Sequence, residues 1–229
     1  MKSSPEFDRY AQDYEDLLHV PLRHHFVTSD DFFHRRKWAL LLDFLQRHGL
    51  SPGDLAWLDV GCGKGELLSK GRSHFGRIAG CDPSREMARG AAGLEVLVQE
   101  TPDVLPFGDA TFDLATAVCV YHHVGEPDRK PLTLEIRRIL RPNGIFCMIE
   151  HNPFNPATQL IVKRCPVDRD ARLLTAHSAR HYTGDAGFRY LETQYFLYFP
   201  ETLYNRMAGA ERLLRSVPFG GQFAIFAQK

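Results

Sequence analysis

The stretch from Trp57 to Leu68 reads Trp-Leu-Asp-Val-Gly-Cys-Gly-Lys-Gly-Glu-Leu-Leu and decides the fold class. An apolar run ends at Asp59, three glycines follow at alternate positions, and a helical pattern begins behind them. This order is typical of a parallel strand that passes through a glycine turn into a helix. Glycines permit a tight turn and leave room for a ligand, and the free N–H groups of the helix attract an anion. The stretch therefore predicts a nucleotide-type binding turn, with a glycine turn that holds no ligand as the alternative.

The spacing of these glycines separates the ligand classes that use such a turn. A dinucleotide fingerprint needs G-x-G-x-x-G, but Glu66 stands where the third glycine belongs. A phosphate-binding P-loop needs Ser or Thr after Gly-Lys, whereas Lys64 is followed by Gly65. The pattern from Asp59 to Gly65 resembles motif I of the class I S-adenosylmethionine-dependent methyltransferases. A nicotinamide oxidoreductase is therefore disfavoured.

A second apolar run, Arg77–Asp82, also ends in a carboxylate, 23 positions after Asp59 (82 minus 59). A βαβ unit places such a carboxylate at the tip of the neighbouring strand, within reach of a ribose diol. The resemblance implies that Asp82 binds both ribose hydroxyls, and the stretch from Cys81 to Met87 resembles the family's strand end and following helix start. The alternative is a helix N-cap in front of Pro83, and both roles can hold at once.

Further segments follow in the family's order. The segment from Asp103 to Asp113 resembles the "LPFxDxxFD" motif of the small-molecule subgroup called type 11. We expect a strand over 114–121, a turn similar to "LRPGG" over 139–144 and a strand over 145–149. The resemblance covers about residues 55–150, and several ordered motifs are more specific than any one of them.

The resemblance implies S-adenosylmethionine as the methyl donor and S-adenosylhomocysteine as the product. The glycines would hold the methionine end, with Asp59 orienting the turn and the donor's ammonium group. Family members often carry an acidic residue near the adenine where this chain has Thr101, so Glu100 or a backbone carbonyl is the alternative contact. The lead segment resembles "FDxxAxxYD", in which Tyr14 would close over the donor; ordinary packing is the alternative. The expected donor-binding residues are Tyr14, Asp59, Gly61, Cys62, Gly63, Gly65, Asp82, Pro83, Met87, Glu100, Thr101 and Cys119.

The predicted fold is α/β, a Rossmann-like three-layer sandwich whose mostly parallel sheet ends with an antiparallel C-terminal strand. Helices and strands alternate to about residue 150, which favours a sheet covered on both faces. We expect an N-terminal helical lid and cap over 1–50 and a donor-binding domain over 51–229. Within that domain, a substrate-cover insertion is expected at about 151–175.

Other elements follow from local patterns. Gly49 is expected to cap a helix that presents one apolar face. A helix is also expected to end at Arg164. Near the C-terminus we expect a strand over 187–199, a helix over 203–215 and a strand over 221–228. The expected apolar face of the first helix is formed by Phe33, Trp38, Leu41, Leu42 and Leu45.

Composition limits the function classes. The 229 residues carry 28 basic and 28 acidic side chains, so the formal net charge of zero gives no support for broad nucleic-acid binding. The polar N-terminus lacks a signal-peptide pattern, and no apolar run is long enough to span a membrane. We therefore expect a cytoplasmic protein, a monomer or homodimer, with a small-molecule acceptor. The cysteines, expected to be free, are Cys62, Cys81, Cys119, Cys147 and Cys165.

The expected reaction is transfer to a small or lipid-like acceptor, most favourably at oxygen. A hydroxyl acceptor benefits from a base, and histidine suits that task near neutral pH. His151 follows the fifth strand and is the first choice, while His123 and His122 end the fourth; structural packing is the alternative for each. Other interpretations are C- or N-methylation of a quinone-like or amino-sugar acceptor and a non-catalytic donor-binding partner protein.

Two further features of the sequence remain open or are rejected. Asn-Pro pairs after residue 151 either hold Asn152 and Asn155 at the mouth of the site or only stop the strand and start a helix. No metal site is expected, because the histidine pairs at 24–25 and 177/181 lack further ligands.

Overall fold

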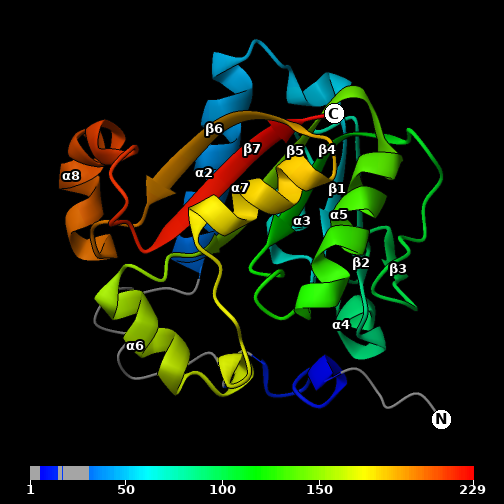
Figure 1. Ribbon diagram of the computed structural model, residues 1–229, viewed down its shortest axis with the longest axis horizontal. Helices are drawn as coiled ribbons and strands as arrows, with labels where there is room; N and C mark the ends of the chain where they lie inside the picture. The colour runs from blue at the N-terminus through cyan, green and yellow to red at the C-terminus, as the bar shows by residue number, and fades with distance from the viewer. Residues whose placement is uncertain (1–5, 15–16, 18–30) are drawn as a thin grey trace.

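Seven strands form one sheet in the part of the chain that the structure describes, in the order β3-β2-β1-β4-β5-β7-β6 (Figure 1). The structure is a computed structural model and describes residues 6–14, 17 and 31–229. Strands β1 to β5 run parallel, and β7 runs antiparallel to both of its neighbours. The predicted sheet is therefore confirmed. The strands are β1 Ala56–Val60, β2 Arg77–Asp82, β3 Val96–Val98, β4 Phe112–Val118, β5 Leu140–His151, β6 Arg189–Phe196 and β7 Gln222–Gln228.

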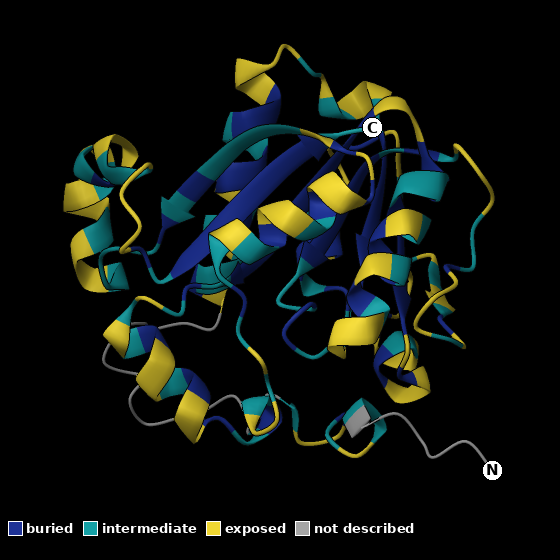
Figure 2. Cartoon of the chain, viewed as in Figure 1, coloured by how far each residue is buried: buried dark blue, intermediate teal, exposed yellow. Residues whose placement is uncertain are grey.

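Helices cover both faces of the sheet. One face packs against α5 (Glu126–Ile139) and α7 (Ala176–Asp185), and the other against α2 (Asp31–Arg47) and α3 (Glu66–Gly71). The central strands between these layers are mostly buried, whereas the edge strands β3 and β6 are largely half-buried (Figure 2). The predicted three-layer sandwich is confirmed. The other helices are α4 Arg85–Gly90, α6 Pro156–Arg164, α8 Glu201–Leu214 and the 3₁₀ turns η1 Glu6–Asp8, η3 Pro52–Asp54 and η4 Pro166–Asp168.

The fourth and fifth strands differ from their predicted bounds. The fourth stops at Val118 rather than residue 121, because Cys119 adopts a left-handed conformation with a φ of 58° and turns the chain away. The fifth begins at Leu140 rather than residue 145. Its register on β4 shifts in this first part, where Asn143 is also left-handed. The expected turn is thus an irregularity inside one long strand.

Helix α2 uses a slightly different face from the predicted one. Leu41 and Leu45 are buried as expected, but Leu40 and Phe44 join them, while the other predicted positions are only half-buried. The reason is a stacked contact: the ring of Phe44 lies parallel to that of Phe226 in β7, with 3.8 Å between centroids. The predicted cap is confirmed, since Gly49 has a φ of 67°.

The boundary of the expected lid stays a prediction. Residues 18–30, including the 24–25 histidine pair, lie outside the described residues. Of the rest, η1 lies against α4, whereas α2 contributes buried side chains to the main core. The helix predicted to end at Arg164 is α6, within the expected insertion.

Candidate active site

A cavity of about 1210 Å³ opens at the carboxyl ends of the strands. It lies where the strand order reverses between β1 and β4, the usual ligand position in open parallel sheets. The cavity brings together most of the predicted residues. Those on its wall are Tyr14, Asp59, Gly61, Cys62, Gly63, Asp82, Pro83, Met87, Glu100, Thr101, Cys119, His122, His123 and His151.

The glycine turn needs its glycines for different reasons. All three have positive φ values, of 68° at Gly61, 57° at Gly63 and 79° at Gly65. A Cβ on Gly61 would lie 2.5 Å from Val120, and one on Gly65 would lie 2.6 Å from Leu94. A Cβ on Gly63 would meet nothing closer than 3.8 Å, so only this glycine leaves open space on the cavity wall. Gly65 does not line the cavity; it caps α3.

Asp82 holds the glycine turn in place. Its carboxylate accepts the N–H of Gly63 at 2.9 Å and the N–H of Ser84 at 2.8 Å. Burial raises the pKa of Asp82, and these two hydrogen bonds oppose that rise. The N-cap of α4 is Ser84, which accepts the N–H of Met87, so Asp82 is not the helix cap. The resemblance implied that Asp59 orients the turn. In the structure it is Asp82 whose carboxylate holds the turn through the N–H of Gly63.

Asp59 is a buried carboxyl next to a buried cation. It is 3% exposed, accepts a hydrogen bond from Thr116 at 2.5 Å, and burial raises its pKa to about 7. The positive charge of Lys37 opposes that rise. Lys37 comes from α2, is 8% exposed and lines the cavity, with Nζ 3.7 Å from the sulfur of Cys119. We did not select Lys37 from the sequence, although a lysine between apolar helix positions was the available signal.

The loop at the expected adenine end is organised by a residue that sequence reasoning missed. The side-chain amide of buried Gln99 donates to the carbonyls of Thr101 at 2.9 Å and Pro102 at 3.2 Å. Glu100 instead forms an exposed ion pair with Arg85 at 2.5 Å. Backbone geometry, rather than a free carboxylate, therefore shapes this wall.

The N-terminal segment closes one side of the cavity. Asp8 accepts a hydrogen bond from Ser84 at 2.5 Å, which ties η1 to the start of α4. Phe7 and Tyr14 both line the cavity. Burial raises the pKa of the Tyr14 hydroxyl, and the charge of Glu66 adds to the rise. Tyr14 is thus a neutral side chain on the cavity wall.

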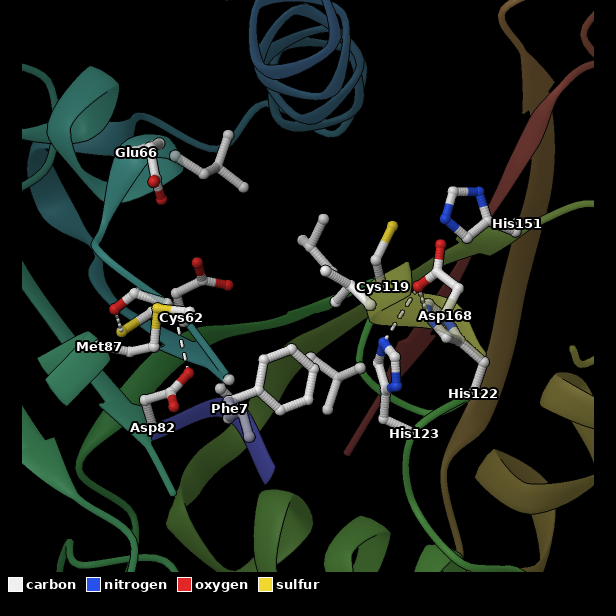
Figure 3. Close-up of a pocket in the computed structure, with 18 of the residues that line it drawn as sticks. Phe7, Cys62, Glu66, Asp82, Met87, Cys119, His122, His123, His151 and Asp168 are labelled. Carbon is white, nitrogen blue, oxygen red and sulfur yellow. Dashed lines mark hydrogen bonds and ion pairs between the residues drawn. The ribbon is translucent and has the colours of Figure 1, made fainter. Parts of the chain in front are cut away.

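Two histidines meet two acids that were not predicted. Nδ1 of His122 lies 2.5 Å from Glu150 of β5. The Nε2 atoms of His122 and His123 lie 3.5 and 3.3 Å from Asp168 of η4 (Figure 3). Burial alone would lower the pKa of His122, but Glu150 and Asp168 raise it to about 10. Burial opposes ionisation of Asp168, yet the nearby imidazoles of His122 and His123 hold its pKa below the ordinary value. A histidine that is already protonated cannot accept a proton, so His122 is unsuited to act as a base at neutral pH.

His151 also lies close to this pair, with its ring centroid 5.2 Å from that of His122 (Figure 3). Its Nδ1 lies 3.3 Å from the side-chain nitrogen of Gln222 in β7, which also lies 3.3 Å from the sulfur of Cys119. Burial would raise the pKa of the Cys119 thiol, but Lys37 and His151 lower it to about 7. The end of β4 is therefore a polar cluster on the cavity wall.

Comparison with known proteins gives this site its family. Residues 58–148 match a family model described as a methyltransferase domain. The match spans the glycine turn, Asp82, all of β4 and most of β5. The segment from residue 58 to residue 148 is a methyltransferase domain. The resemblance read from the motifs is thereby confirmed.

Curated relatives of this methyltransferase domain match different shares of the chain. A tRNA (carboxymethyluridine(34)-5-O)-methyltransferase of Arabidopsis thaliana is 28% identical over 170 residues, which cover 73% of this chain and 39% of the relative. A methyltransferase of Synechocystis is 30% identical over 116 residues, 48% of this chain and 54% of the relative. The chain thus spans about half or less of the length of these curated relatives.

Solved structures confirm the fold of the methyltransferase domain. An S-adenosylmethionine-dependent methyltransferase of Thermotoga maritima superimposes with a TM-score of 0.68 at 20% identity, covering 97% of this chain and 98% of that one. The [4+2]-cyclase SpnF superimposes with a TM-score of 0.62 at 20% identity, over 99% and 97% of the chains. At this identity the likeness shows the fold alone.

The two asparagines after β5 have structural contacts. Asn152 is buried and donates to the carbonyls of Pro218 at 3.0 Å and Gly220 at 2.8 Å. Asn155 caps α6 by accepting a hydrogen bond from the N–H of Thr158. Its side-chain nitrogen donates to the backbone carbonyl of Phe219 at 2.8 Å. Of the pair, only Asn155 touches the cavity, so Asn152 does not stand at its mouth.

In the described part of the chain, no helix of the methyltransferase domain has the length and apolarity needed to cross a membrane.

Proposed function

We propose that this chain transfers a methyl group from S-adenosylmethionine to a hydroxyl oxygen of a small or lipid-like acceptor. The observation that carries the proposal is the glycine turn, held open by Asp82 on the cavity wall, within a segment that matches a methyltransferase domain. Gly63 leaves there the space that a Cβ would fill. Fold alone would not support this reaction, because a cyclase shares it.

The side chains on the wall fit the charges of this donor. S-adenosylmethionine, when bound, supplies a methyl group already activated by a sulfonium. Asp59 would receive the donor's ammonium group and Lys37 its carboxylate, since both side chains are buried on the cavity wall. Asp82 would bind the ribose hydroxyls with the lone pairs left free by the backbone. Thr101 and the loop around it would enclose the adenine, with Pro83, Met87 and Glu100 at the rim.

The opposite side of the cavity suits an acceptor with an apolar body and one polar group. The volume of the whole cavity exceeds that of most single-ligand pockets, as expected if two ligands bind side by side. Aromatic and aliphatic side chains line the cavity, including Phe33, Ile161 and Phe199. The Oε1 atom of Gln222 is buried and has no hydrogen-bond partner among the described residues, so it is available to an acceptor hydroxyl. His151, bonded to the same amide, would accept the proton of that hydroxyl, with His123 as the second choice.

The cover over this side would exclude water from the reaction. We propose that residues 1–50 and the insertion at about 151–175 act together as the lid. Two contacts support this proposal, because each joins a cover segment to the sheet side of the cavity. Asp8 accepts a hydrogen bond from Ser84, and Asp168 forms an ion pair with His123. Alignment and water exclusion account for much of the catalysis when the donor is already activated.

Calorimetric titration of the full chain with S-adenosylmethionine and S-adenosylhomocysteine, with NAD as the control, tests the donor. We expect both sulfur compounds to bind and NAD not to bind; binding of NAD alone would overturn the proposal. Asp82→Asn should weaken donor binding, because an amide cannot accept from both backbone N–H groups. Asp54→Asn, at the opposite end of β1, is the matched control.

An acceptor screen with a labelled methyl group tests the reaction. Phenols, hydroxylated lipids and sugars form the main arm, and amines, quinone-like rings and tRNA form the others. Label in a hydroxyl compound supports the proposal, and label confined to the other arms corrects the acceptor. Donor binding with no labelled product would favour a non-catalytic binding protein. His151→Ala should lower the rate while donor affinity is kept.

A further inference from the structure

Three side chains with metal-ligating atoms converge on the acceptor side of the cavity. His122 and His123 follow β4, and Asp168 reaches them from η4, a distant part of the chain (Figure 3). One ligand atom from each lies within 4.8 Å of the other two, and all three residues line the cavity. Two imidazoles and one carboxylate are a ligand set suited to divalent transition metals.

The distances in this cluster are those of ligands around an ion. The Nε2 atoms of His122 and His123 lie 3.5 and 3.3 Å from Oδ1 of Asp168. Charge-assisted hydrogen bonds are shorter, about 2.7–2.9 Å. Two ligand atoms at the usual distance from a tetrahedral zinc ion are about 3.4 Å apart. In the same cluster the contact from His122 to Glu150 is 2.5 Å, so short contacts form where no ion would intervene.

Glu150 supplies the outer contact that metal-bound histidines usually have. Its fully buried carboxylate meets Nδ1 of His122 and also accepts the N–H of Tyr121 at 2.7 Å. This arrangement fixes the ring with Nε2 directed toward Asp168. A carboxylate behind a ligating histidine orients the ring and increases its basicity toward a metal.

The surrounding backbone holds the cluster rigid. Buried Arg129 donates to the carbonyls of Tyr121 at 3.2 Å and Val124 at 3.0 Å, on the two sides of the histidine pair. It also donates to the carbonyl of Arg172 at 3.1 Å, and the backbone N–H of Arg172 donates to the backbone carbonyl of His122 at 2.8 Å. The segment that carries Asp168 is thus bonded directly to the turn that carries the histidines. Rigid positioning of this kind is what a ligand set requires.

We infer that His122 Nε2, His123 Nε2 and Asp168 bind one divalent ion of the zinc type, with the remaining coordination position open to the cavity. The ion would take the place of a proton on Nε2 of His122. Three protein ligands with one open position are the pattern of sites that bind an exchangeable oxygen ligand. The assignment of an acceptor oxygen to that position rests on the proposed function, whereas the inference of metal binding does not.

Metal titration of the untagged, chelator-treated full chain tests this inference. We expect one equivalent of Zn²⁺ to bind in calorimetry, and Co²⁺ to give the visible absorption of a four-coordinate ion. Asp168→Asn and His123→Gln should each abolish both signals. Glu150→Gln should weaken binding about 10- to 100-fold, the usual effect of losing an outer contact. His181→Gln is the matched control, because His181 forms an exposed pair with Asp185 at 3.4 Å on α7.

The outcomes separate a metal site from an ion pair that only holds the cover. Failure of the parent protein to bind either ion overturns the inference, as does binding that survives both Asp168→Asn and His123→Gln. Thermal unfolding and S-adenosylmethionine titration of each variant show whether it is folded. A parent chain that binds the donor but no metal overturns this inference alone, and one that binds metal but no donor overturns only the proposed function.

Discussion

Asp59 and Asp82 end neighbouring strands, but their surroundings give them different properties. Asp82 receives two backbone N–H groups, whereas Asp59 has Thr116 and the more distant charge of Lys37. The same carboxylate chemistry therefore fixes a turn in one case. In the other it leaves a buried group that ionises near neutral pH.

The first prediction concerns the pH dependence of stability. The pKa of Asp59 is raised from 3.8 to about 7 in the folded state, so its ionisation destabilises the fold increasingly as the pH rises from 3.8 to 7. Asp59→Asn keeps an acceptor for Thr116 but cannot ionise. Between pH 5 and pH 8 the free energy of unfolding of the variant should gain about 2–4 kcal/mol relative to the parent. Urea unfolding at the two pH values measures this, and a difference that does not change with pH contradicts it.

Cys119 should be the most reactive thiol of the five. Its pKa is about 7, whereas burial raises the pKa of Cys165 to about 11 and that of Cys62 higher still. At pH 8 we expect iodoacetamide to label Cys119 first, as seen by peptide mass spectrometry. Bound S-adenosylmethionine should slow the labelling, and Lys37→Met should slow it by removing the cation. Earlier labelling of Cys165, which is more buried than Cys119, would contradict the prediction.

Gly63 and Gly49 allow strain to be separated from ligand contact. Both are left-handed, and neither has a close neighbour in the direction of a Cβ. Alanine at either position should cost about 1–2 kcal/mol of stability through backbone strain. Only Gly63→Ala should weaken donor binding, because only Gly63 lines the cavity. Equal donor affinity in the two variants, measured by calorimetry, would argue against the glycine turn as the donor site.

At the scale of elements, α6 begins where the sequence left two explanations open. Asn155 caps the helix and also touches the cavity. Asn155→Ala should cost about 1 kcal/mol, the usual effect of a lost cap, and Asn155→Ser should restore most of it. Thermal unfolding measures both. If instead both variants keep their stability and lose methyl transfer, Asn155 contacts the acceptor.

Most elements of the sheet were predictable because each core strand is an apolar run with a clear end. The donor side was predictable for the same reason, since Asp59, Asp82 and the glycines lie next to strand ends in the sequence. The error at Val118 arose because apolar residues continue past the strand, and only the backbone conformation of Cys119 ends it. Periodicity does not contain that information.

The acceptor side was less predictable because its contacts join distant segments. Asp168 meets the histidines only after η4 has folded over the ends of the strands. Gln222 meets His151 only because β7 pairs with β5. Lys37 faces inward because α2 packs on the sheet through Phe44. Local patterns identify such residues as polar, but they do not show which of them will meet.

At the scale of the whole molecule, α2 links the cavity to the core. Phe44 is fully buried against Phe226, and Lys37 lies two helical turns earlier on the cavity wall. Phe44→Ala should therefore cost about 3–5 kcal/mol of stability and also weaken donor binding. Chemical denaturation and calorimetry measure the two effects. Phe33→Ala, half-buried on the same helix, is the comparison, and it should cost less stability.

The place of β7 in the sheet has a consequence during synthesis on the ribosome. It separates β5 from β6, although both are translated before it. Until residues 222–228 emerge from the exit tunnel, both strands present unpaired edges, which are sites of aggregation. A nascent chain stalled before residue 222 should therefore associate with chaperones that bind exposed strands. A chain whose residues 222–228 have been carried clear of the exit tunnel by an added C-terminal linker should be released from them.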